Sequence, residues 1–233
     1  MISVVIAAKD CERWIQRTIK SLLDQDFQDW ECLISVNGSS DRTEEIARSI
    51  DDSRFKVIIS EIPNKSLAVN RALIESKRDI ICILDADDLW HPMKLSRQYE
   101  SFIENRPDIL GTQMIYIDED DKETRAAPRL PVDHNSCISC LKNRENPIAN
   151  SSVMYRKDIH DKVGYYNPEV SAVEDYDIWM RSMRAGLKFQ NLNEKFLLHR
   201  IHSTSNYNSS LNQQVLKSLI DQIDAFYGQM RQK

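Results

Sequence analysis

The stretch IICILDADD, residues 80–88, decides the fold of this chain. Its first five residues are apolar and have the length of a strand that is buried on both faces. Asp85, Asp87 and Asp88 follow, at the point where such a strand would leave its sheet. Carboxylates this close repel one another unless a cation offsets their charge. The ligand expected for such a cluster is a hard divalent metal ion that also coordinates phosphate oxygens. The alternative is an acidic turn that is exposed to solvent.

The composition is that of an ordinary globular protein. The 233 residues are 41% hydrophobic and 29% charged, which suits one α/β domain with or without an appendage. A net charge of -5 argues against nucleic-acid binding. No apolar stretch approaches the ~20 residues that span a bilayer, and the N-terminus lacks the basic start of a signal peptide. With an odd number of cysteines as well, we expect a cytoplasmic protein with reduced thiols and no transmembrane segment.

Strand-like and helix-like segments alternate over the first hundred residues, which predicts a parallel sheet with right-handed crossovers. The expected strands are 2–7, 30–36, 55–59 and 80–84, and the expected helices are 14–23, 41–50, 67–76 and 92–105. Ligands of such sheets collect beyond the carboxyl ends of the strands. That edge would gather residues 8–10, 37–39, the Lys65 region and 85–88. The chain has neither a G-x-G-x-x-G nor a P-loop motif, which weakens the dinucleotide and nucleotidyltransferase readings.

The second half of the chain is less regular. We expect a strand over 109–117, a solvated hairpin tip at the acidic run 118–121, and a long loop over 122–146. Residues 150–155 and 196–202 read as further strands, and 173–181 as a helix that starts with acids. Acids favour a first helical turn, so helix capping is the alternative role for Glu174, Asp175 and Asp177. The tail puts apolar residues on one stripe over 211–230, which predicts a helix that packs on the domain or on a second subunit as a homodimer contact.

Several motifs in order resemble those of the family 2 inverting glycosyltransferases with a GT-A fold, over residues 1 to about 205. They are SVVIAAKD (3–10), IKSLLDQ (19–25), ISVNGSSD (34–41), SLAVN (66–70), LDADDLW (84–90), EDYDIW (174–179) and RIH (200–202). The resemblance implies an α/β fold with one GT-A domain, in which helices flank a Rossmann-like, mainly parallel sheet. Residues 1–105 would form the nucleotide-sugar-binding half, 106–205 the acceptor-binding half, and 206–233 a C-terminal helix.

The implied activity is transfer of a hexosyl or hexosaminyl group from a nucleoside-diphosphate sugar, with a UDP-sugar favoured. The acceptor would be a hydroxyl of a glycan or of a lipid-linked saccharide in surface polysaccharide synthesis. A lipid-linked acceptor would bring the chain to the inner face of the membrane without an anchor of its own. The resemblance also implies a divalent metal, Mn²⁺ or Mg²⁺, held by Asp85, Asp87 and His202. The implied donor-binding residues are Ala8, Asp10, Asn37, Lys65, Asn70, Asp85 and Ala86.

The acids at the start of the helix 173–181 are the candidate catalytic residues. Inversion by one displacement needs a carboxylate that takes the proton of the attacking hydroxyl. The resemblance gives this role to Asp175, with Glu174 positioning the acceptor or the base. The chain departs from the family pattern at Val36, Asn37 and Val69, all on the donor side. The alternative is therefore a catalytically weak or inactive member that serves as a nucleotide-sugar-binding or carbohydrate-binding module.

Overall fold

The computed structural model describes residues 1–170, 172–202, 217–218 and 220–223. Within them an eight-stranded sheet runs in the order β3-β2-β1-β4-β7-β6-β8-β5. The strands are β1 Ile2–Ala8, β2 Trp30–Asn37, β3 Phe55–Ser60, β4 Ile80–Ile83, β5 Leu89–Trp90, β6 Ile109–Ile117, β7 Met154–Arg156 and β8 Phe189–Arg200. The helices are α1 Ile15–Leu23, α2 Thr43–Arg48, α3 Lys65–Glu75, α4 Lys94–Asn105, α5 His134–Lys142, α6 Ile159–Val163 and α7 Glu174–Arg184, with a 3-10 turn η1 at Asn150–Ser152.

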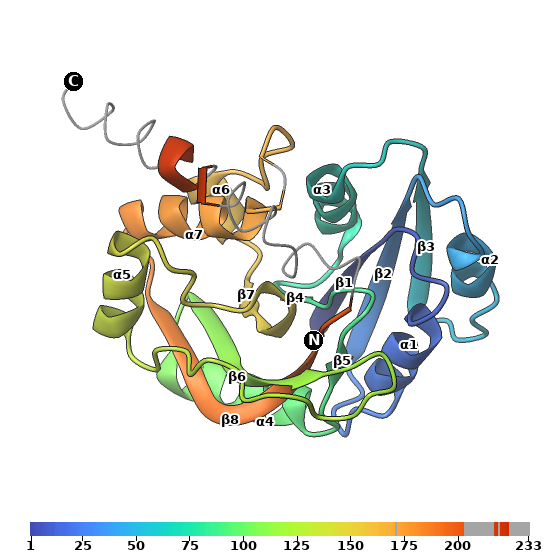
Figure 1. Ribbon diagram of the computed structural model, residues 1–233, viewed down its shortest axis with the longest axis horizontal. Coiled ribbons are helices and arrows are strands. Elements are labelled where there is room, and N and C mark those ends of the chain that lie inside the picture. The colour runs from blue at the N-terminus through green and yellow to red at the C-terminus, as the bar shows by residue number, and fades with distance from the viewer. Residues whose placement is uncertain (171, 203–216, 219, 224–233) are drawn as a thin grey trace.

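The first four long strands form a parallel unit, with β1 between β2 and β4 and β3 outside β2. β1 is buried on both faces, so its alternate side chains enter different cores. Ile2, Val4 and Ile6 pack with α1 and α4, whereas Val5 packs with α3 and α7. Figure 1 shows α3 and α7 on the same side of the sheet. At the carboxyl ends of β1 and β2 the chain continues into α1 and α2, and ligands of such sheets collect at this edge.

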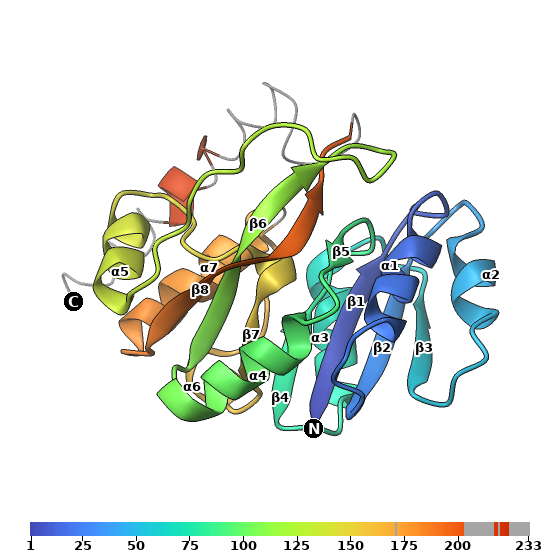
Figure 2. The ribbon, with the colours of Figure 1, turned by 90° about the horizontal axis from the view of Figure 1, so that it is seen from below.

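The second half completes the sheet with mixed directions. β7 pairs antiparallel with both β4 and β6, and β8 runs parallel to β6. Figure 2 shows β6 and β8 side by side, away from the parallel strands of the first half. β5 pairs antiparallel with the end of β8, so the loop between β4 and β5, residues 84–88, lies beside the last residues of β8. This pairing brings together the two parts of the chain that carry Asp87 and His202.

The predicted α/β fold is confirmed, with local corrections. Residues 150–152, predicted as the start of a strand, form the 3-10 turn η1, and β7 begins only at Met154. The segment 122–146 is not one long loop, because it contains α5, which Asp133 caps by accepting a hydrogen bond from Ser136 N at 3.0 Å. The last strand begins at Phe189 rather than at 196. The acidic run 118–121 is a turn, as expected, but two of its acids, Glu119 and Asp121, pair with arginines.

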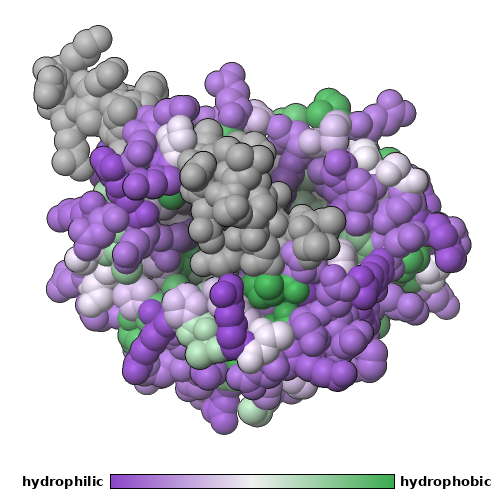
Figure 3. Space-filling model, in the orientation of Figure 1, coloured by the Kyte–Doolittle hydropathy of each residue, from purple (hydrophilic) through white to green (hydrophobic). Residues whose placement is uncertain are grey.

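Most of the predicted C-terminal helix, 206–233, lies outside the described residues. Residues 217–218 and 220–223 are helical, and Ile220 and Ile223 pack against the core on the α7 side of the sheet. Asp221 pairs with Arg144 at 2.5 Å. Among the described residues no helix has the length and apolarity needed to cross a membrane. Over the described residues, the face of the molecule seen in Figure 3 is largely hydrophilic.

Gly111 is a packing constraint between β6 and β8. It pairs with Asn191, whose fully buried Nδ2 donates to the carbonyl oxygens of Pro131 (2.6 Å) and Pro147 (2.8 Å). A Cβ at position 111 would overlap Asn191 Oδ1 and press on Ile148. A side chain here would therefore displace the residue that holds the segment around α5 against β8.

Gly111→Ala should lower the free energy of unfolding by ~1–3 kcal/mol, the usual loss when a packed core is overfilled. Urea denaturation measures this change. In an Asn191→Ala background the same substitution should cost less, because the truncated side chain leaves room for the new Cβ. An equal loss in both backgrounds would contradict the proposed overlap.

Candidate functional site

The loops after β1 and β2 are joined by the predicted donor residue Asp10. Its carboxylate accepts hydrogen bonds from Ser40 N (2.7 Å) and Ser40 Oγ (3.0 Å), and its own N–H donates to Ser39 Oγ (3.2 Å). The Ser40 N–H bond, opposed by slight burial, holds the pKa of Asp10 below its usual value. Ala8 and Asn37 are buried at the ends of β1 and β2. These residues form one wall at the predicted edge.

Lys65 links the predicted donor acids to the predicted catalytic acids. The side chain of Asn64 caps α3 by accepting from Leu67 N, and Lys65 is the first residue of that helix. The Lys65 ammonium lies 2.9 Å from Asp85 Oδ1 and 3.3 Å from Glu174 Oε1. Burial alone would lower the pKa of Lys65, but the charges of Asp85 and Glu174 outweigh it and raise the pKa well above the usual value. The ammonium is therefore a fixed positive charge.

Asp85 and Asp87, two residues apart, sit in different electrostatic surroundings. Burial raises the pKa of Asp85, and the charges of Asp88 and Asp87 add to this while Lys65 opposes it. Burial also acts to raise the pKa of Asp87, but the hydrogen bond from His202 and the nearby histidine charges lower it overall. The surroundings of Asp87 thus favour its ionised form.

Asp87 and His202 form the pair that fits a metal ion. His202 Nε2 lies 2.9 Å from Asp87 Oδ2, and the ring of Trp14 packs on His202 with centroids 4.2 Å apart. Two ligands at ~2.1 Å in adjacent octahedral positions lie about 3 Å apart, so this nitrogen and oxygen suit one ion. Among the described residues no three His, Cys, Asp or Glu side chains form a complete metal site. An ion here would need further oxygen ligands, such as water or phosphate, which is usual for Mg²⁺.

Asp88 fastens this loop to the end of β8. It is fully buried and its carboxylate accepts hydrogen bonds from Arg200 N (2.8 Å) and His199 Nδ1 (3.1 Å). Burial opposes protonation of His199, but the charge of Asp88 raises its pKa to about 9. From the sequence, Asp88 is only one of the three acids of the cluster 85–88. Its structural function is to hold the loop at the distance from β8 that the Asp87–His202 pair requires.

Asp175 lies in the first turn of α7 with both carboxylate oxygens engaged. Oδ1 accepts from Tyr176 N at 2.7 Å, and Oδ2 accepts from Asn146 Nδ2 at 2.6 Å. Burial and the neighbouring Glu174 raise the pKa of Asp175 to about 7. A carboxylate with this pKa can accept a proton near neutral pH. Sequence reasoning missed Asn146, because a lone asparagine in a polar segment has no pattern that marks a long-range contact.

Two predicted donor residues have other partners. Asn70 Nδ2 donates to Tyr166 O at 2.7 Å and its Oδ1 accepts from Tyr166 N at 2.9 Å, which fastens α3 to the segment before α7. Ala86 is buried, and its carbonyl oxygen lies 2.9 Å from the hydroxyl of Thr18. Their contact with a donor stays a prediction. In this structure Asn70 connects α3 to the segment before α7, and Ala86 connects the loop 84–88 to α1.

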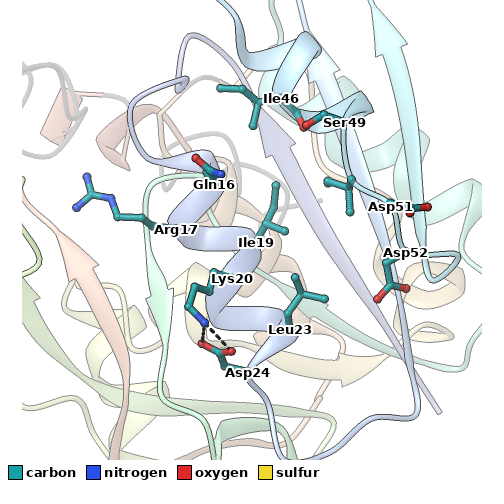
Figure 4. Close-up of a pocket in the computed structure, with 11 residues that line it drawn as sticks. Gln16, Arg17, Ile19, Lys20, Leu23, Asp24, Ile46, Ser49, Asp51 and Asp52 are labelled. Atoms are coloured by element: carbon teal, nitrogen blue, oxygen red, sulfur yellow. Dashed lines mark hydrogen bonds and ion pairs between the residues drawn. The ribbon is translucent and has the colours of Figure 1, made fainter.

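A separate groove of about 600 Å³ lies between α1 and α2. Figure 4 shows Ile19 and Leu23 of α1 facing Ile46 of α2 across it, with the Lys20–Asp24 ion pair at its side. None of the predicted site residues lines this groove. The chemistry therefore belongs to the edge formed by the β1, β2 and β4 ends, and not to this groove.

Residues 3–164 match the family model described as Glycosyl transferase family 2. O-antigen biosynthesis glycosyltransferase WbnJ of Escherichia coli is 30% identical over 218 residues, which cover 91% of this chain and 84% of WbnJ. UDP-Glc:alpha-D-GlcNAc-diphosphoundecaprenol beta-1,3-glucosyltransferase WfaP of Escherichia coli is 30% identical over 208 residues, which cover 88% of this chain and 79% of WfaP.

A solved structure shares the fold. The match to the crystal structure of S. aureus TarS 1-349 in complex with UDP-GlcNAc has a TM-score of 0.74 at 17% identity, over 94% of this chain and 66% of that chain. This likeness supports a GT-A type of domain. The family match covers more than half of the chain and includes the strand ends described above. The chain belongs to glycosyl transferase family 2 and is a glycosyltransferase.

Proposed function

We propose that this protein transfers a hexosyl or hexosaminyl group, with inversion, from a nucleoside-diphosphate sugar to a saccharide hydroxyl in surface polysaccharide synthesis. One observation carries the proposal: the Lys65 ammonium joins Asp85 to Glu174, so the donor-side acids and Asp175 belong to one site. The names of WbnJ and WfaP support a glycan or lipid-linked acceptor. WfaP and the TarS complex support a UDP-sugar donor. A lipid-linked acceptor would place the reaction at the inner face of the membrane.

At the donor end, Asp87 and His202 are the residues that would hold a divalent ion, with Asp85 close to the same phosphates. The ion, Mn²⁺ or Mg²⁺, would neutralise the charge that develops on the leaving nucleoside diphosphate. Lys65 supplies a fixed positive charge at the same edge. Asp10, Asn37 and Ala8 would line the nucleoside pocket, since they form the wall beside β1 and β2.

At the acceptor end, Asp175 acts as the general base. The acceptor oxygen attacks the anomeric carbon, the bond from that carbon to the phosphate oxygen breaks, and the hydroxyl proton passes to Asp175. The N–H groups of Asn146 and Tyr176 hold the carboxylate in place and leave it able to accept this proton. Lys65 holds Glu174 beside the base. One displacement inverts the configuration at the anomeric carbon.

The alternative function is a binding module without turnover, because Asn37 replaces an acid of the family pattern. A panel of nucleotide sugars with and without Mn²⁺ separates the two functions. We expect metal-dependent UDP-sugar hydrolysis or transfer by the wild-type protein. Asp87→Ala should abolish the metal dependence of UDP binding in isothermal titration calorimetry. UDP-sugar binding without turnover of any donor would support the binding module instead.

Asp175→Asn should lower kcat by roughly 10²–10⁴-fold and leave UDP affinity unchanged, because the amide cannot take up the proton while the donor-side residues keep their side chains. Steady-state kinetics and calorimetry measure the two effects. Asp177→Asn is the matched control, since Asp177 lies on the same helix but pairs with Arg181 at 2.7 Å. It should lower the melting temperature and keep kcat within a few-fold. Loss of UDP binding in Asp175→Asn would indicate a structural cap instead of a base.

The pH dependence of kcat/KM should follow Asp175. A base acts only when deprotonated, so kcat/KM should rise with pH and level off above about 7. Asn146→Ala removes a hydrogen bond that stabilises the carboxylate, which raises the pKa and moves the rising limb to higher pH. Asn143→Ala is the control, because its side chain makes no hydrogen bond to Asp175 among the described residues. Identical pH profiles for wild type and Asn146→Ala would refute this role.

A further inference from the structure

The acidic turn Asp118–Asp121, which follows β6, is held in an unusual backbone conformation. The bridge between Ile117 and Glu123 closes its base, and Asp118 Oδ1 accepts from the backbone N–H groups of Asp120 (2.9 Å) and Lys122 (3.0 Å). Asp121 has a φ of 68°, in the left-handed region that few non-glycine residues adopt. The proposed function leaves this turn without a role.

Arg200 connects the turn to the loop that carries Asp87. Its side chain is fully buried, with Nε donating to Asp87 O at 2.7 Å and Nη1 donating to Asp118 O at 2.6 Å. Its Nη2 lies 2.5 Å from Asp121 Oδ1. A buried guanidinium needs a counter-charge, and Asp121 is the carboxylate that pairs with the Arg200 side chain within the described part of the chain.

A second arginine holds the same acid from α1. Arg17 Nη1 lies 2.9 Å from Asp121 Oδ2, and its Nη2 donates to Glu119 O at 3.0 Å. Asp121 therefore joins one guanidinium from α1 to another from β8, with one oxygen for each. Glu119, in the same turn, pairs instead with the more exposed Arg13.

We propose that Asp121 is a positioning residue for the Asp87–His202 pair, acting through Arg200; the proposal rests on the metal site of the proposed function. Asp121 neutralises Arg200, Arg200 holds the backbone carbonyl of Asp87, and His202 lies two residues beyond Arg200. Without the counter-charge, the buried guanidinium would be an unpaired charge in the protein interior. This is destabilising, so the Arg200 side chain would move towards solvent. The carbonyl of Asp87 would then lose its donor, and the Asp87–His202 distance would no longer be fixed. Loss of such outer partners typically weakens metal binding by about 10–100-fold.

The test measures the affinity for Mn²⁺ at saturating UDP. Mn²⁺ is titrated into the protein, and binding is monitored by calorimetry and by the electron paramagnetic resonance signal of free Mn²⁺. Asp121→Asn should weaken Mn²⁺ binding by about 10–100-fold. Asparagine tolerates the left-handed backbone and keeps the side-chain size, so the substitution removes the charge and one of the two acceptor oxygens. Glu119→Gln, which makes the same change two residues away, should alter Mn²⁺ affinity less than twofold.

Arg17→Gln keeps the inference testable if Asp121→Asn does not fold, which circular dichroism would reveal. It leaves the Asp121–Arg200 pair in place but removes one support of Asp121, so it should weaken Mn²⁺ binding by a smaller factor. Equal Mn²⁺ affinity in wild type and in folded Asp121→Asn would overturn the inference, as would unchanged affinity in Arg17→Gln where Asp121→Asn does not fold. Absence of Mn²⁺-dependent UDP binding in the wild type would instead overturn the proposed metal site, and this inference with it.

Discussion

The carboxylates of the loop between β4 and β5 require partners, because Asp88 is fully buried and Asp85 and Asp87 are half-buried, and this requirement organises the molecule. Asp85 pairs with Lys65 of α3, Asp87 with His202, and Asp88 with His199 and the backbone of Arg200. The partners come from two distant places in the chain, so satisfying these carboxylates fastens α3 and the end of β8 to one loop. An ionised carboxylate buried without such partners would be strongly destabilising.

The same pairing unites the two halves of the domain. The parallel strands of the first half supply the loop, and the second half supplies β8 and α7. Lys65 completes the connection, because its ammonium reaches Asp85 on one side and Glu174 on the other. Asp175, next to Glu174, thus has a fixed relation to the donor edge although ninety residues separate it from Asp85 in the sequence. The geometry of the site is a consequence of charge neutralisation as much as of packing.

Hydrophobic runs and helix-capping preferences in the sequence predicted the buried strands and the helix starts of the site. The apolar run 80–84 supplies the buried strand β4 because its side chains face a core on both sides, and Asp175 lies in the first turn of a helix, where acids are favoured. The segment that became α5 was missed because its capping residue, Asp133, stands in a polar, proline-containing stretch. The start of β8 was missed because its middle residues are exposed beside register shifts in β6. Asn146, Arg17 and Asp121 act through contacts across 29 to 104 residues, and no local periodicity encodes such contacts.

The charges of the site also explain why the proposed donor would need a cation. Asp85, Asp87, Glu174 and Asp175 gather around the ammonium of Lys65, while His199 and the backbone N–H of Arg200 already serve Asp88. A nucleoside diphosphate would add negative charge to a region where carboxylates already outnumber the free cationic groups. An ion bound between Asp87 and His202 would offset this excess beside the phosphates, without disturbing the Lys65 pairs that hold Glu174 next to the base. The proposed metal binding at Asp87 and the proposed proton transfer at Asp175 would therefore use separate groups, and the Lys65 pairs with Asp85 and Glu174 connect the two parts of the site.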